Sequence, residues 1–394
     1  MPTNSQRAQE IDTYIAGHSC AKGKQKLVIS GKVEPLESYL LPWTLLQYNH
    51  ENSRFNLEIA EEEGKIGRKL DPSDPDDVKK IRQLLLMDEN EARKLREDLL
   101  LIGEQTEVAA ITHDGIVVNG NRRMATLQLL HADEPTGKWE NLWVVRLPHD
   151  ISESDLWKIE AGMQLSKAKV ADYGPVNNLL MIADGARAGL TNAEIAASMY
   201  GWTEKQVEID LARLNLIEVF LDFFGQPKNH GLIKKFRLHQ HFIELQKSLV
   251  DPMNSAGIPS REKMRKIHNV FLYLRATILE PDTVSLTYHQ VRSLGKILQD
   301  TDATFALEDS FSSYKKDIKK IPFEKLADNL DKALDVRKDK SDKDKPGKLV
   351  DRAITALNNI DRSSAHFKSD PLFPGKLEKL SAIVDQMKSD VGLS

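Results

Sequence analysis

Apolar residues recur with two different periods along the chain. Between residues 26 and 148, short runs of the β type are interleaved with helical segments, whereas almost every run after Ser152 has helical spacing. The expected strands lie at residues 27–30, 39–46, 108–112, 116–118 and 141–147. The expected helices of this part follow Asp71 and cover residues 92–101 and 124–130. The pattern therefore predicts an α+β fold, in which a mixed N-terminal domain precedes a mostly α-helical region.

Composition shifts divide the chain further. The first 25 residues are polar and irregular, which predicts a flexible N-terminal arm. Residues 337–348 hold six basic and three acidic residues and no apolar one, which is typical of a solvated charged linker. The predicted parts are the arm over residues 1–25, a mixed domain over 26–148, a helical domain over 149–225, a second helical domain over 226–336, the linker over 337–348 and a helical C-terminal module over 349–394.

The overall composition narrows the class of protein. With 40% hydrophobic residues and no apolar run near the ~18–20 residues that span a bilayer, the chain is expected to be globular and cytoplasmic, with no membrane partner. Its single cysteine, Cys20, excludes an internal disulfide and a multi-thiolate zinc site. Because 55 Lys and Arg stand against 59 Asp and Glu, the net charge is −4, and any contact with DNA must come from a local basic patch.

A strand, a polar turn and a helix meet at Gly120. The free N–H groups of a first helical turn, together with the helix dipole, favour an anion at such a position. Asn121 is expected to cap the helix, and Arg122 and Arg123 carry guanidinium groups that suit phosphate oxygens. An ordinary capped helix with two surface arginines fits the same residues. The turn therefore makes Gly120, Asn121, Arg122 and Arg123 candidates for binding phosphate.

The elements around this turn resemble the core of the ParB/sulfiredoxin superfamily. Residues 100–130 hold a helix ending in Gly, a strand, an Asp-Gly hairpin, a strand and a Gly-x-Arg-Arg box that opens a helix. Upstream, residues 41–55 are similar to the extended entry segment of ParB-type members. The resemblance covers residues 26–148, about a third of the chain. It implies a nucleotide site lined by Asn49, Asn52 and Arg54 in addition to the Gly box.

Departures from the family pattern limit the chemistry. The catalytic cysteine of sulfiredoxins is replaced by Asn121, so sulfur chemistry is not expected. A Glu-Asn pair and an Arg that serve the metal and phosphates in ParB-type CTPases are missing. In the corresponding region of this chain, Glu160 and Gln164 lie four residues apart on one helix face. This pair could approach the metal or the phosphates, but it also fits an ordinary solvated helix surface. The resemblance implies a nucleoside triphosphate, CTP or ATP, with Mg²⁺, and makes Glu160 the candidate metal ligand.

A second motif lies at residues 190–214. Thr191 and Glu194 form a capping box for one helix, Gly201 supplies a turn, and Thr203 can cap the next helix. This is the spacing of a helix-turn-helix, although the second helix carries two basic against three acidic residues and also fits a structural hairpin. A basic stretch with interleaved aromatics follows at residues 234–242. The candidate DNA contacts are Thr203, Lys205, Gln206, Arg213, Lys234, Lys235 and Arg237.

These features together predict a function. We expect a bacterial, phage or plasmid protein that resembles ParB, binds a nucleoside triphosphate as a conformational switch, contacts DNA and forms a homodimer. One alternative is a nuclease, nucleotide hydrolase or phosphotransferase on the same fold, of the kind found in mobile-element or phage-defence loci, with Glu160 or Asp114 as general base or metal ligand. Another is a protein-docking adaptor with a vestigial pocket.

Overall fold

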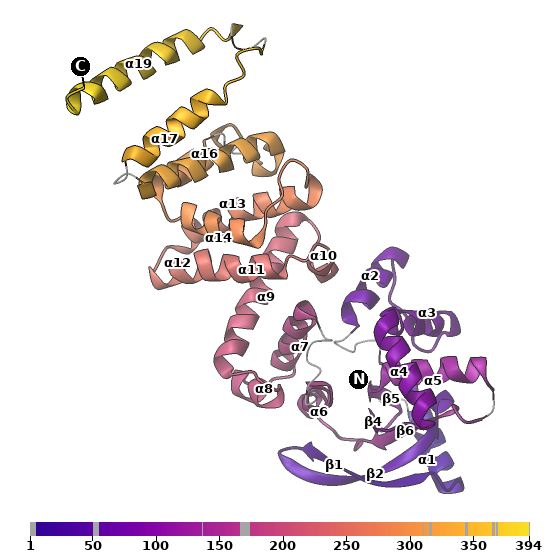
Figure 1. Cartoon of the computed structure of the whole chain (residues 1–394). Coiled ribbons are helices and arrows are strands. Elements are labelled where there is room, and N and C mark those ends of the chain that lie inside the picture. The colour runs from indigo at the N-terminus through magenta and orange to yellow at the C-terminus, as the bar shows by residue number, and fades with distance from the viewer. Residues whose placement is uncertain are drawn as a thin grey trace. The chain divides into compact units, whose positions relative to one another are not determined.

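In the computed structural model, the chain forms two compact units, Met1–Lys296 and Ile297–Ser394 (Figure 1). The described residues are 5–49, 55–135, 137–165, 174–309, 311–314, 317–342, 346–364, 367 and 369–393. The fold is α+β, as predicted, with a mixed six-stranded sheet and many helices. The ranges of the expected domains stay predictions.

The sheet belongs to the first unit and has the strand order β1-β2-β6-β4-β5-β3. β1 (Ala21–Ile29) and β2 (Lys32–Pro42) form a hairpin, which makes both strands longer than their apolar runs predicted. β6 (Asn141–Arg146) pairs antiparallel with β2 and parallel with β4 (Ala109–Ile111). β5 (Ile116–Asn119) pairs antiparallel with β4 and parallel with the short β3 (Gln47–Tyr48).

Within the described residues, five helices precede β6 in the chain. They are α1 (Ser5–Gly17), α2 (Asn56–Ile66), α3 (Pro75–Leu85), α4 (Glu89–Ile102) and α5 (Asn121–Asp133), with a short 3-10 turn at Trp43–Leu45. The arm predicted over residues 1–25 is different in the structure, because α1 lies in it and β1 begins in it. Ile11 of α1 is fully buried in the domain core, and Arg7 donates hydrogen bonds to Asp114 and Gln47. These partners are distant in sequence, so the local pattern of the arm did not reveal them.

The remainder of the first unit is helical. It comprises α6 (Glu153–Leu165), α7 (Pro175–Arg187), α8 (Asn192–Ser198), α9 (Glu204–Phe224), α10 (His230–Lys235), α11 (His239–Leu245), a π-helical turn (Gln246–Val250), α12 (Asp251–Ser255), α13 (Ser260–Leu279) and α14 (Tyr288–Ile297). Phe220, Phe242 and Phe271 are fully buried and meet edge to face or tilted, which joins α9, α11 and α13.

In the second unit, all the regular elements of the described residues are helical. It contains α15 (Thr301–Leu307), 3-10 turns at Phe311–Tyr314 and Ile318–Lys320, α16 (Phe323–Asp342), α17 (Pro346–Asn358) and α19 (Phe373–Asp390). α16 continues to Asp342, so the first half of the predicted linker is helical. Lysine and arginine are good helix formers, and the helix that begins at Phe323 simply propagates into the charged stretch.

Candidate functional site

Gly120 closes the turn between β5 and α5. It is the N-cap residue of α5 and has φ +109°, a conformation that side-chain-bearing residues rarely adopt. A Cβ atom at this position would lie 2.6 Å from the Cβ of Ala109 on the neighbouring strand β4. The glycine is therefore required both by the backbone conformation and by the close approach of α5 to the sheet.

Asn121 does not cap α5, contrary to the prediction. Its side chain is buried, and its amide nitrogen donates to the Val117 carbonyl at 2.8 Å. Its amide oxygen accepts a hydrogen bond from the backbone N–H of Asn49 at 3.0 Å. The predicted residues Asn49 and Asn121 are thus brought together, but the contact holds the end of β3 against the start of α5. Because Gly120 takes the cap position, Asn121 is one residue too far along the helix to reach the first N–H groups.

The two arginines of the box have different surroundings. Arg123 donates to the carbonyl and to the carboxylate of Glu107, both at 2.7 Å, and its side chain is only 13% exposed. Burial lowers the pKa of Arg123, while the charge of Glu107 opposes that shift. This guanidinium joins α5 to the segment that precedes β4. It is not among the residues that line the cavity described next.

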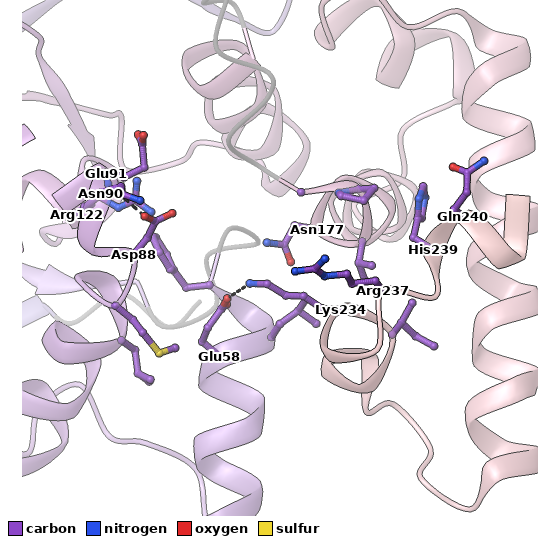
Figure 2. A pocket seen from close by; sticks show the side chains of 18 of the residues that line it. Glu58, Asp88, Asn90, Glu91, Arg122, Asn177, Lys234, Arg237, His239 and Gln240 are labelled. Atoms are coloured by element: carbon purple, nitrogen blue, oxygen red, sulfur yellow. Dashed lines mark hydrogen bonds and ion pairs between the residues drawn. The ribbon is translucent and has the colours of Figure 1, made fainter. Parts of the chain in front are cut away.

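Arg122 lies at a cavity of about 920 Å³ (Figure 2). Its Nε donates to the Leu85 carbonyl at 3.3 Å, and its guanidinium carbon lies 5.4 Å from the centre of the Phe55 ring. The volume is within the range of small-molecule sites, roughly 300–1,000 Å³. The Gly box therefore contributes one of its two arginines to a cavity large enough for a nucleotide.

Two walls enclose this cavity, and they come from distant parts of the sequence. The first wall consists of residues around α2, α3, α4 and the start of α5: Phe55, Leu57, Glu58, Leu84, Met87, Asp88, Asn90, Glu91, Lys94 and Arg122. The second comes from the starts of α7 and α11 and from α10 with the loop after it: Gly174, Pro175, Val176, Asn177, Ile233, Lys234, Arg237, His239 and Gln240. Figure 2 shows Lys234 and Arg237 directed from the second wall toward the first.

Charged side chains of both signs line the cavity, and several are paired. Lys94 donates to Glu91 at 2.9 Å, and this bond lowers the pKa of Glu91. Lys234 forms an ion pair with Glu58 that crosses between the two walls. Arg237 has a left-handed backbone with φ +52°, and no side chain in the described part of the chain pairs with its guanidinium. With Arg122, it is the cation best placed to accept an anionic ligand.

The second wall also holds neutral polar groups. Burial lowers the pKa of His239 to about 4, and the nearby Arg213 charge adds to the shift, so the imidazole is neutral at pH 7. Gln240 and Asn177 add amide groups, and Val176 and Ile233 add apolar surface. Neutral donors and acceptors beside apolar carbon suit an uncharged heterocycle.

Other predicted residues are not brought to this cavity. Glu160 of α6 is not one of its lining residues. Asp114 is buried in the hairpin turn, where it accepts hydrogen bonds from Thr112 and Arg7, which is a structural use. Asn52, Arg54 and the side chain of Gln164 lie outside the described residues. Their predicted roles stay predictions.

The helix-turn-helix has the predicted local geometry. Thr191 and Glu194 form the capping box of α8, with each side chain bonded to the other's backbone N–H. Thr203 caps α9 by accepting from the Gln206 N–H at 3.2 Å. Val207 and Leu214 of α9 are buried, as expected. Thr203 is therefore committed to holding the start of the second helix.

The charges of α9 differ from the prediction. Arg213 and Asp210 were expected on the exposed face, but both are buried and form an ion pair at 2.6 Å. Asp210 also accepts from the indole of Trp202 at 3.0 Å and from the amide of Gln206 at 2.8 Å. The Arg213 side chain is thus removed from the candidate DNA surface. Lys205 is exposed and pairs with Glu208 at 3.0 Å.

Sequence reasoning missed most of the cavity. Glu58, Asp88, Lys94 and His239 carry no motif, and each looks like an ordinary surface residue in the sequence. Lys234 and Arg237 were singled out, but as DNA contacts rather than as cavity residues. Only the packing of α10 near α2 places them opposite Arg122. No spacing rule connects residues that are more than a hundred positions apart.

The chain was compared with models of protein families, with curated protein sequences and with solved structures, and it matches none of them. Within the described residues, no group of three or more His, Cys, Asp and Glu side chains is arranged to hold a metal ion. Nor does any described helix combine the length and apolarity needed to cross a membrane.

Proposed function

We propose that this protein binds a nucleoside triphosphate in the cavity beside Arg122. The observation that carries the proposal is the position of Arg122, which belongs to the strand–turn–helix at Gly120 and lines the cavity together with Lys94 and Arg237. Guanidinium and ammonium groups at these positions suit phosphate oxygens. The neutral His239, Gln240 and apolar carbons of the second wall suit the base. Any Mg²⁺ would enter with the triphosphate.

The nucleotide would act as a conformational ligand. Arg122 and Lys94 belong to one wall and Arg237 to the other, so a polyphosphate held by all three stabilises the arrangement in which the walls face each other. A ligand shifts a conformational equilibrium only by its difference in affinity for the two states. Binding across the cavity supplies that difference, which agrees with the switch that the ParB resemblance implies.

Isothermal titration with ATP, CTP, GTP and UTP in the presence of Mg²⁺ tests this proposal. We expect one or more of them to bind, and we expect Arg122→Ala to weaken binding by about 10- to 100-fold, since a hydrogen bond to a charged group contributes roughly 1.5–3 kcal/mol. Arg93→Ala is the matched control, because Arg93 is exposed on α4 and does not line the cavity. Folded protein that gives no heat with any nucleotide would contradict the proposal.

DNA contact through α9 is a second candidate function, favoured by the capped α8–turn–α9 geometry. After the loss of Arg213 to the interior, the exposed predicted cations are Lys205, Lys234, Lys235 and Arg237, and two of them, Lys234 and Arg237, line the cavity. In fluorescence anisotropy with duplex DNA, we expect Lys205→Ala to weaken binding for all sequences and to reduce the slope of log K against log salt by about 1. Lys24→Ala in the β1–β2 hairpin serves as the control. Binding that is absent at low salt would instead favour the adaptor.

A further inference from the structure

The last helix, α19, has an apolar seam that the described part of the chain leaves largely uncovered. At its start, the Phe373 ring packs against Phe367, with the ring centroids 5.0 Å apart. Phe373, Leu377, Leu380, Val384, Met387 and Val391 follow one another at alternating steps of four and three residues. This is the spacing of the a and d positions of a coiled coil over more than two heptads. None of the described residues of α19 is buried, and Val384 and Met387 remain 41% and 49% exposed. A helix with such a seam is incomplete without a partner.

The preceding helix does not match this seam in length. α17 has 13 residues and α19 has 18, which correspond to about 20 Å and 27 Å of helix. The exposed apolar residues of α17, Val350, Ile354 and Leu357, span only two helical turns. α17 can therefore cover about half of the seam at most. An occupant with a seam of equal length is needed for the rest.

A second α19 in antiparallel orientation meets that requirement. With a two-fold axis at the level of Ala382, Leu380 faces Val384 of the other copy, and Leu377 faces Met387. Phe373 faces Val391 at the two ends. In each of these three pairs, an a position of one copy is opposite a d position of the other. The seams of the two copies therefore cover each other along their whole length.

The flanking charges favour the same register. On one border of the seam lie Lys376, Ile383 and Asp390, at steps of seven residues. In the antiparallel arrangement, Lys376 of each copy lies opposite Asp390 of the other, and the two Ile383 side chains meet at the axis. A parallel pair would place Lys376 opposite Ser381 and would gain no ion pair. The charge pattern is thus self-complementary only when the helices run in opposite directions.

We propose that α19 is the surface by which two copies of this chain associate, as an antiparallel two-helix coiled coil. The apolar seam supplies the attraction and the two Lys376–Asp390 pairs set the direction. The proposal is independent of the nucleotide cavity, because none of its residues belongs to the first unit. It also leaves Glu378, Lys379 and Gln386 on the outer face.

Charge reversal on the full-length chain tests the register, with sedimentation equilibrium as the measurement. Lys376→Asp brings two Asp–Asp contacts into the dimer, and Asp390→Lys brings two Lys–Lys contacts. We expect each single variant to weaken dimerisation by about tenfold or more, and the double variant to return to near the wild-type affinity. Both single changes place charges favourably for the helix dipole, so loss of helix is not expected, and circular dichroism checks this.

Lys379→Asp is the matched control, since it makes the same change of charge on the outer face of the helix. It should leave the dimer unchanged. Three results would each overturn the proposal: a wild-type chain that stays monomeric at all concentrations, single variants that dimerise as well as the wild type, or a double variant that remains as weak as the singles.

Discussion

Replacing Gly120 with alanine should destabilise the sheet domain by about 2–4 kcal/mol. The new Cβ would lie 2.6 Å from the Cβ of Ala109, and the residue would have to keep a φ of +109°. Either the backbone or strand β4 must move, and α5 must move with it. A urea titration followed by the fluorescence of Trp43, Trp139 and Trp143, which all lie in this domain, measures the loss.

Two further variants separate the causes of this loss. Gly67→Ala imposes a comparable left-handed strain at the end of α2, where a Cβ would meet no atom within 4 Å, so it should cost only about 1–2 kcal/mol. The double variant Ala109→Gly/Gly120→Ala removes the steric contact and should recover part of the stability. If Gly120→Ala lowered the free energy of unfolding no more than Gly67→Ala does, the close approach of α5 to β4 would be contradicted.

Replacing Asp210 with alanine should destabilise the helix-turn-helix region by about 3–5 kcal/mol, because it leaves a buried guanidinium without its counter-charge. Asp210 is the common acceptor for Arg213, Trp202 and Gln206, so one substitution removes all three interactions. The fluorescence of Trp202, whose indole donates to Asp210, reports the unfolding of this region directly.

The buried pair makes an opposite prediction for a double variant. Asp210→Leu/Arg213→Leu removes both charges and should be far more stable than Asp210→Ala, since two apolar side chains need no counter-charge. Asp222→Ala, at an exposed position of the same helix, should change the stability by no more than about 0.5 kcal/mol. An Asp210→Ala protein as stable as the Asp222→Ala control would show that the ion pair is exposed to solvent.

Local features were predictable from the sequence where neighbours in the chain decide them. The capping box at Thr191 and the cap at Thr203 depend on residues within four positions, and both are confirmed. The hairpin turn at Asp114 and the strand–turn–helix at Gly120 are present as well. Two local predictions were wrong, because the cap of α5 falls on Gly120 rather than on Asn121 and because α16 continues into the predicted linker. Because Asn121 lies one residue beyond the cap position, its amide is a buried group of the core instead of a helix cap.

The partners of charged side chains were not predictable. Arg122 and Arg123 are adjacent in the Gly-x-Arg-Arg box, and the sequence does not distinguish them. The helix turns about 100° between the two residues, so Arg122 faces the cavity and Arg123 faces Glu107. Arg213 looked like a surface cation and is buried beside Asp210. In each case the decisive neighbour comes from packing, and the sequence shows only that a charge is present.

The sequence by itself determined the α+β class, the local turns, the caps at Thr191 and Thr203, and the helical spacing of the C-terminal module, because these follow from periodicity and from contacts within a few residues. The tertiary structure alone decided that α1 is part of the core, that Arg123 and Arg213 are committed to carboxylates, and that Lys234 and Arg237 lie across a cavity from Arg122. The physical reason is that burial and charge pairing depend on which distant segments meet, and that choice is made by the packing of the whole unit.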